Sequence, residues 1–181
     1  MRNQQSQKRG KILIIASLAK SLINFRLDLL QELQAHGFEV VTCAGDDDSS
    51  VVESLAKQSV CHHKISLSNT KINPFKDLSD CWRLVKFIKR QNPDIVLSYT
   101  IKPVIYGSLA GWLAGVRNIC SMVTGLGYVF LNNSLKGKII RFFVRFLYRR
   151  SLCFNQAVFF QNPEDSKLFV DNRLVNKKQV C

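Results

Sequence analysis

The residues from Thr100 to Tyr106 could hold an anion. Thr100 and Lys102 follow the apolar run at residues 95–97, and Pro103 comes directly after Lys102. Proline is favoured at the first position of a helix, so we expect a helix to begin at Pro103, with Lys102 just before it. The unpaired N–H groups of a helix N-terminus and an adjacent ammonium group can hold a diphosphate without a metal ion. We therefore predict that Thr100 and Lys102 contact a phosphate, with Tyr106 one helical turn further on.

A second loop could add backbone N–H groups to the same site. Thr124, Gly125 and Gly127 come directly after residues 116–123, which are predicted to form a strand. The carboxyl ends of neighbouring parallel strands meet at one edge of an open α/β sheet, and ligands bind at that edge. Both loops are therefore expected to face the same ligand.

A third loop follows the first predicted strand, residues 11–16, and leads to Ser21, Asn24 and Arg26. Residues 11–36 contain no glycine. The loop is therefore not the G-x-G-x-x-G turn with which dinucleotide-binding proteins approach a pyrophosphate. Its polar side chains instead predict a pocket built from side chains, at the same edge of the sheet as the other two loops.

These residues also allow an ordinary structural interpretation. Arg26 could be a solvated residue of a first helical turn, and Lys102 could be an exposed surface lysine. The only histidines are His36, His62 and His63. Adjacent residues of a strand point to opposite faces, so His62 and His63 cannot chelate one metal ion. We expect no metal site.

Strands and helices are predicted to alternate along the chain, which indicates βαβ units and a parallel sheet. The expected fold class is α/β, a Rossmann-like parallel sheet with helices on both faces. Predicted strands cover residues 11–16, 38–44, 60–67, 95–97, 116–123 and 157–161. Predicted helices cover residues 23–34, 49–58, 74–91 and 135–152, a segment from Pro103 and a short segment from Pro163. Ser49 or Ser50 is the predicted N-cap of the second of these helices. The periodicity predicts buried stripes of Phe25, Leu29, Leu30 and Leu33, and of Leu78, Trp82, Val85 and Ile88.

Size and composition indicate one folded domain. The chain has 181 residues and 46% hydrophobic residues, and it contains neither a signal peptide nor a transmembrane segment. We expect a basic disordered tail at residues 1–10 and one domain at residues 11–181. The six cysteines include no C-x-x-C pair, so free thiols in a reducing cytoplasm are expected, with Cys43, Cys61 and Cys120 buried in strands.

The net charge of +13 predicts an anionic partner. Four cations recur at helical spacing within residues 135–152 and form one stripe, and most of the remaining positions of this helix are apolar. Such a helix can lie on an anionic membrane surface, or it can be a core helix with a charged edge. No nucleic-acid-binding motif is present. The residues expected to face a membrane are Lys138, Arg141, Phe142, Arg145, Phe146 and Arg149.

Several segments together resemble the family 4-type glycosyltransferases of GT-B fold. The resemblance is carried by TIKP at residues 100–103, YGSLA at 106–110, LAGV at 113–116 and TGLG at 124–127. Two further segments, SLINFRL at 21–27 and NPFKDL at 73–78, resemble the bacterial branch that acts on undecaprenyl-diphosphate-linked sugars. The resemblance runs from Lys11 to the end of the chain.

This resemblance implies an acceptor-binding N-terminal domain whose partner is a polyprenyl-diphosphate-linked sugar. Many relatives carry a His-Gly pair where this chain has Thr124 and Gly125, so no histidine is available there and no catalytic residue is assigned. The pocket implied by the resemblance comprises Ser21, Asn24, Arg26, Thr100, Lys102, Tyr106, Thr124, Gly125 and Gly127.

In the resembled family a C-terminal domain binds the UDP-sugar donor through a paired-glutamate motif, which this sequence lacks. We therefore expect no cofactor, no transferase activity of the isolated chain, and a peripheral location on the inner face of the cytoplasmic membrane. Two alternatives remain open. The chain could be a non-catalytic membrane-docking subunit that pairs with a separate donor-binding chain, or a truncated product without function.

Overall fold

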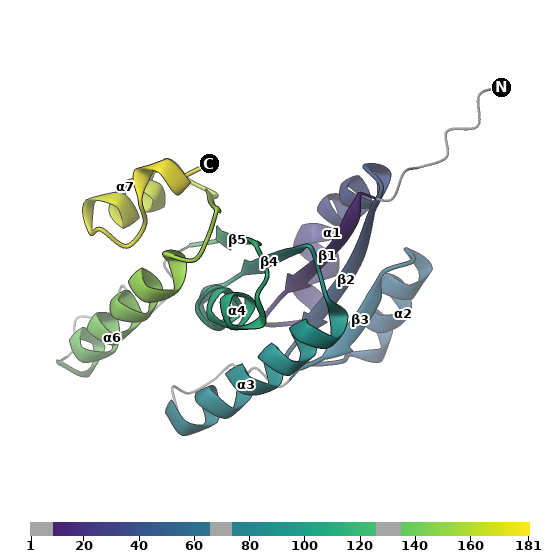
Figure 1. Cartoon of the computed structure of the whole chain (residues 1–181), viewed down its shortest axis with the longest axis horizontal. Helices are drawn as coiled ribbons and strands as arrows, with labels where there is room; N and C mark the ends of the chain where they lie inside the picture. The colour runs from purple at the N-terminus through teal and green to yellow at the C-terminus, as the bar shows by residue number, and fades with distance from the viewer. Residues whose placement is uncertain (1–8, 66–73, 126–134) are drawn as a thin grey trace.

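A six-stranded parallel sheet forms the centre of the computed structural model, which describes residues 9–65, 74–125 and 135–181 (Figure 1). The strand order is β3-β2-β1-β4-β5-β6. The strands are β1 (Gly10–Ile15), β2 (Phe38–Ala44), β3 (Cys61–Lys64), β4 (Ile95–Tyr99), β5 (Asn118–Val123) and β6 (Ala157–Phe160). The helices are α1 (Lys20–Ala35), α2 (Ser49–Lys57), α3 (Pro74–Gln91), α4 (Ile101–Ala114), α6 (Leu135–Leu152), α7 (Pro163–Asp171) and the 3₁₀ helix η1 (Lys177–Gln179). The predicted fold class is confirmed.

Helices cover both faces of the sheet, which explains why its strands are apolar runs. Ile12 and Ile14 of β1 belong to one core with α1 and α2. Leu13 and Ile15 point the other way, into a second core with α3 and α4. A third core joins α4, α6 and α7 over β5 and β6, and its largest buried side chains include Tyr148.

The strand order reverses next to β1. On one side Ile15 pairs with Cys43 of β2, and on the other it pairs with Ser98 of β4. The chain reaches β4 only after leaving the far edge of the sheet at β3 and returning through α3. The connections after β1 and β4 therefore diverge to opposite faces. Open α/β sheets bind ligands at such a point between the carboxyl ends of two strands, and this point is called here the crevice beside β1.

A buried polar network fixes α4 and α6 to β5. The Ser121 Oγ–H donates to Oδ1 of Asn155 at 2.7 Å, and the Asn155 Nδ2–H donates to Oγ of Ser108 at 2.9 Å. The same amide also donates to the carbonyl oxygen of Ser151 near the end of α6. Because all its members are paired and buried, the network holds these elements in one arrangement.

Several predicted helix starts were wrong. Helix α4 begins at Ile101, with Thr100 at the N-cap position, so Pro103 is the third helical residue and Lys102 lies inside the first turn. The N-cap of α2 is Asp48, whose carboxylate accepts the Ser50 N–H at 3.0 Å. An aspartate carboxylate therefore caps α2 where a serine hydroxyl of Ser49 or Ser50 was predicted.

Several predicted buried positions were also wrong. Phe25 is 70% exposed, Leu78 58% and Trp82 56%. An 18-residue helix such as α3 is about 27 Å long, whereas a five-residue strand such as β4 is about 17 Å long. The helix therefore extends past the sheet (Figure 1). Leu78 and Trp82 lie beside the buried face of α3 rather than on it, because that face runs through Asp77, Cys81, Leu84 and Ile88.

The cysteines of the described residues are free thiols. Cys43 is buried and Cys120 half-buried, but Cys61 is exposed because β3 is an edge strand. None of the described helices is long and apolar enough to cross a membrane.

Candidate functional site

The crevice beside β1 is lined by hydroxyl groups from two loops. The hydroxyls of Ser17 and Thr100 form a hydrogen bond of 2.5 Å across the gap between the ends of β1 and β4. In the first turn of α1, Oγ of Ser21 lies 2.7 Å from the phenol oxygen of Tyr99. These contacts join segments that are far apart in the sequence, at the edge where the sequence predicted the site.

The loop after β1 is also held by the loop after β2. The Ala19 N–H donates to a carboxylate oxygen of Asp46 at 2.6 Å, and the Gly45 N–H donates to the carbonyl oxygen of Ser17 at 3.2 Å. A loop fixed from two sides presents its hydroxyls in a defined position, which a binding site requires.

Arg26 supplies the positive charge of this crevice. Its guanidinium carbon lies 5.1 Å from the centre of the Tyr99 ring, and its Nη1–H donates to the Phe25 carbonyl oxygen at 2.7 Å. The Arg26 Nε–H is buried and has no hydrogen-bond partner among the described residues. Burial raises the pKa of Tyr99 to about 12, so the phenol stays neutral and does not cancel the charge of Arg26. This arrangement suits an anionic ligand.

Lys102 lies on the other side of Thr100 and forms an ion pair that the sequence did not predict. Its Nζ lies 3.2 Å from Oδ1 of Asp77 in the first turn of α3, and the Tyr106 hydroxyl donates to Oδ2 of the same carboxylate at 3.1 Å. Asp77 is 4% exposed. Burial, together with the negative charge of Asp77, raises the pKa of Tyr106 far above its ordinary value. The predicted phosphate contact of Lys102 stays a prediction, and the structure adds a carboxylate that orients the ammonium group.

For the remaining predicted pocket residues within its described ranges, the structure gives a position but no contact with the groups described above. Asn24 is exposed on α1, and Thr124 is half-buried directly after β5. Gly125 has a φ of +127°, which only glycine adopts readily. Gly127 lies outside the described residues. Within residues 9–65, 74–125 and 135–181, no group of three His, Cys, Asp or Glu side chains could hold a metal ion.

Sequence reasoning did not place Tyr99 or Asp77 in the site. Tyr99 is the last residue of a strand and therefore looks like a core aromatic, and it does pack in the core beneath α1. Asp77 looks like a residue that stabilises a helix N-terminus, where carboxylates are common. Only the packing of α3 against α4 brings its carboxylate to Lys102 and Tyr106.

The backbone of Thr100 is strained, with φ +70° and ψ +160°. Glycine adopts this region almost alone, and strained residues cluster at ligand-binding sites, at about 1–3 kcal/mol each. Thr100→Ala keeps the strain and loses the hydrogen bond to Ser17, whereas Thr100→Gly relieves the strain. We expect the glycine variant to be about 1 kcal/mol more stable than the alanine variant, the reverse of the usual order. Urea unfolding of both variants measures the difference, and equal or reversed stabilities would contradict the strain.

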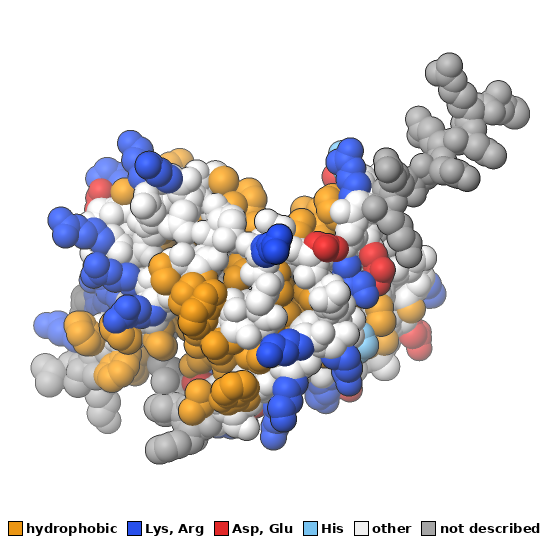
Figure 2. Space-filling view, in the orientation of Figure 1, with side chains coloured by type: hydrophobic (Ala, Val, Ile, Leu, Met, Phe, Trp, Pro, Cys, Tyr) orange, Lys and Arg blue, Asp and Glu red, His pale blue; other side chains and the backbone are white. Residues whose placement is uncertain are grey.

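Helix α6 combines a core face with an exposed amphiphilic face. Val144 and Tyr148 are buried against α4, while Phe142 is 71% exposed and Phe146 49%. Among the predicted membrane-facing cations, Lys138 and Arg149 are exposed, and Arg141 and Arg145 are half-buried. The helix thus packs on the sheet and still presents aromatic and cationic side chains outward (Figure 2).

The sequence and the fold were compared with known proteins. Residues 11–162 match the family described as glycosyl transferase 4-like. The N,N'-diacetylbacillosaminyl-diphospho-undecaprenol alpha-1,3-N-acetylgalactosaminyltransferase of Campylobacter jejuni is 24% identical over 172 residues, which cover 94% of this chain and 45% of that protein.

Solved structures show the same fold. The chain resembles MurG of Acinetobacter baumannii with a TM-score of 0.59 and 15% identity, over 94% of this chain and 43% of that one. It also resembles the UDP-GlcNAc 2-epimerase of Neisseria meningitidis, with a TM-score of 0.63 and 16% identity, over 94% of this chain and 45% of that one. The chain thus spans less than half the length of these relatives. Since the matched residues include β1 to β6 and every described segment of the crevice, the chain belongs to the glycosyl transferase 4-like family.

Proposed function

We propose that this chain is the acceptor-binding domain of a glycosyltransferase that adds a sugar to a polyprenyl-diphosphate-linked glycan. The observation that carries this proposal is the match along 94% of the chain to a transferase whose name specifies a diphospho-undecaprenol substrate. The crevice beside β1 supports it, because Arg26 places a positive charge over Tyr99, the residue before the strained Thr100, at the edge where open α/β sheets bind ligands.

The chemistry of the crevice suits a sugar diphosphate. The guanidinium of Arg26 and the ammonium of Lys102 lie near opposite ends of the segment from Tyr99 to Lys102, and they can contact phosphate oxygens. The hydroxyls of Ser17, Ser21 and Thr100 can exchange hydrogen bonds with sugar hydroxyls. The UDP-sugar donor, in this proposal, is bound by residues outside this chain, so the isolated chain binds acceptor without turning it over.

The acceptor lipid requires a membrane surface, and two helices suit that role. The exposed aromatic side chains of α6 lie among its cations, and the first turns of α3 expose Leu78 and Trp82. Aromatic and basic side chains on one face are typical of helices in the interface of anionic membranes. We propose that the chain docks on the inner face of the cytoplasmic membrane.

The same exposed face also favours a second candidate function. A chain that only docks on the membrane and recruits a separate donor-binding subunit would need the surface of α6 but not the crevice beside β1. In that case Arg26 would be dispensable for binding lipid-linked sugar.

Sedimentation with phosphatidylcholine and phosphatidylglycerol vesicles, with and without undecaprenyl-diphosphate-linked sugar, tests both functions. We expect binding that weakens in high salt and tightens when the vesicles contain the sugar lipid. In Arg26→Ala the affinity for vesicles with the sugar lipid should fall about tenfold, the effect of losing one charge-assisted phosphate contact. Lys57→Ala, on the exposed side of α2, is the matched control and should behave as the wild type. Binding that ignores the sugar lipid would favour the docking subunit instead.

A further inference from the structure

A basic groove separates α6 from the segment that follows α7. One cavity of about 580 Å³ lies along α6, and a second of about 610 Å³ continues it toward the end of the helix. Arg149 and Leu174 line both cavities, so the two form one groove. No Asp or Glu is among the residues that line it in the described part of the chain. The groove lies apart from the crevice beside β1, which α6 does not line.

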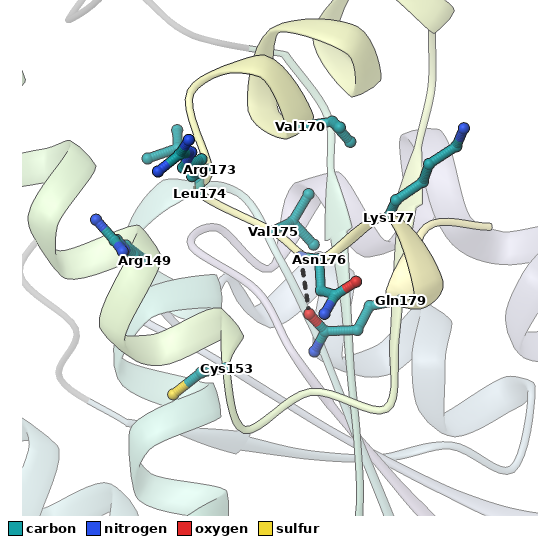
Figure 3. Close-up of a pocket in the computed structure, with 9 residues that line it drawn as sticks. All are labelled: Arg149, Cys153, Val170, Arg173, Leu174, Val175, Asn176, Lys177 and Gln179. Atoms are coloured by element: carbon teal, nitrogen blue, oxygen red, sulfur yellow. Dashed lines mark hydrogen bonds between the residues drawn. The ribbon is translucent and has the colours of Figure 1, made fainter.

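The cations of the groove come from three places in the chain. Lys138, Arg141, Arg145 and Arg149 belong to α6, Arg173 follows α7, and Lys177 begins η1. In Figure 3 the side chains of Arg149 and Arg173 extend to the same side, whereas Lys177 extends away from them. None of the ion pairs between described residues involves Arg145, Arg149 or Arg173. Their charges are therefore not compensated by carboxylates of the described chain.

The two ends of the groove differ in chemistry. Phe142 and Phe146 line the end nearer the start of α6, and both are exposed. The other end combines Arg149 and Arg173 with apolar side chains such as Val175. It is kept in shape by η1, where the Gln179 Nε2–H donates to the carbonyl oxygen of Leu152 at 3.0 Å. Asn176 and Gln179 hold this turn through a bond of 3.0 Å (Figure 3). Cations thus line the whole groove, and aromatic side chains join them at one end, which matches an anionic amphiphile.

We infer that this groove binds the headgroup of one anionic phospholipid, with Arg149 and Arg173 on its phosphate and Phe142 and Phe146 against its acyl chains. The inference rests on the proposed membrane location, and it assigns the residues that choose the lipid. Guanidinium groups suit this task, because they donate two parallel hydrogen bonds to a phosphate. A nucleic acid would contact the cations, but it has no acyl chains to cover Phe142 and Phe146.

Titration of the 181-residue chain with short-chain phosphatidylglycerol below its micelle concentration tests this inference, with amide NMR shifts as the readout. We expect saturable binding at one site, with shifts along α6 and around Arg173. Arg173→Ala should weaken binding about tenfold or more, as expected for the loss of a hydrogen bond to a charged group. Lys178→Ala removes the same charge from the same segment but does not line the groove, and it should change binding less than about twofold.

Other results would overturn the inference. Non-saturable binding, or an equal loss of lipid affinity in Arg173→Ala and Lys178→Ala, would mean that the lipid binds to a diffuse basic surface and not to one site. Glycerol 3-phosphate or a short oligonucleotide binding as tightly as the lipid would show that the aromatic end contributes nothing. Both Arg149 and Arg173 are exposed, so their substitution does not threaten folding. Because the titration contains neither vesicles nor sugar lipid, its failure is distinct from failure of the proposed acceptor function.

Discussion

Gly107→Ala is expected to lower the free energy of unfolding by about 2–3 kcal/mol, the upper range for overpacking a well-packed core. A Cβ atom added at Gly107 would lie 2.2 Å from Oγ of Ser98 and 3.2 Å from Cδ1 of Ile15. Helix α4 packs on β4 and β5 at this point, so the helix cannot move away without disturbing the network of Ser108 and Asn155. Urea unfolding followed by circular dichroism measures the loss.

A second substitution identifies the cause of this loss. The Ser98 hydroxyl is buried without a hydrogen-bond partner among the described residues, so Ser98→Ala alone should be neutral or slightly stabilising. In the double variant the closest atom is gone, and most of the stability should return, which gives a non-additive mutant cycle. Gly111→Ala is the control, because its added Cβ would meet only the side chain of Ile119, at 3.2 Å from Cδ1 and 3.3 Å from Cγ1, and no atom closer than 3.0 Å. Equal losses at Gly107 and Gly111 would contradict the close approach described here.

Lys102→Met is expected to lower the free energy of unfolding by about 3 kcal/mol, because it leaves the buried carboxylate of Asp77 without its cation. The side chains of Lys102 and Asp77 are 17% and 5% exposed, so solvent screens this pair little. The Tyr106 hydroxyl still donates to the carboxylate in the variant, but one neutral hydrogen bond does not replace an ion pair. Urea unfolding at neutral pH provides the measurement.

The double variant Asp77→Asn/Lys102→Met separates folding from binding. It buries no charge, and the new amide can still bond to the Tyr106 hydroxyl, so most of the lost stability should return. If Lys102 also contacts the diphosphate, the refolded double variant should still bind lipid-linked sugar about tenfold more weakly than the wild type. Wild-type affinity in the stable double variant would mean that Lys102 serves only the packing of α3 against α4.

The fold was predictable because its determinants are local. Residues 12–15 form a continuous apolar run and residues 40–44 a run interrupted only by Thr42, as expected for strands with both faces covered. Gly37 ends the helix between them with a φ of +86°. The alternation of such strands with helices permits few topologies. The edge that carries the candidate site followed from this topology without knowledge of any side-chain contact.

The composition of the site was predictable only in part, because it depends on contacts between distant segments. Arg26 and Lys102 were singled out as cations, but the partner of each is set by tertiary packing. Nothing in the sequence shows that Asp77 turns toward Lys102, since a carboxylate in a first helical turn is ordinary on a solvated helix. Periodicity likewise identifies which residues share a face of α3, but it did not show that the buried face runs through Cys81 and Leu84 rather than through Trp82.

The position of β1 has a consequence for synthesis of the protein. Ile12 and Ile14 pair with β2 early in the chain, but the other edge of β1 pairs with β4, which is made much later. As the chain leaves the ribosome, the half-sheet of β1, β2 and β3 therefore carries an open apolar strand edge until residues 95–99 arrive. Non-local pairing of this kind forms slowly, and exposed strand edges invite aggregation. Nascent chains that pause before β4 should be the form that chaperones capture.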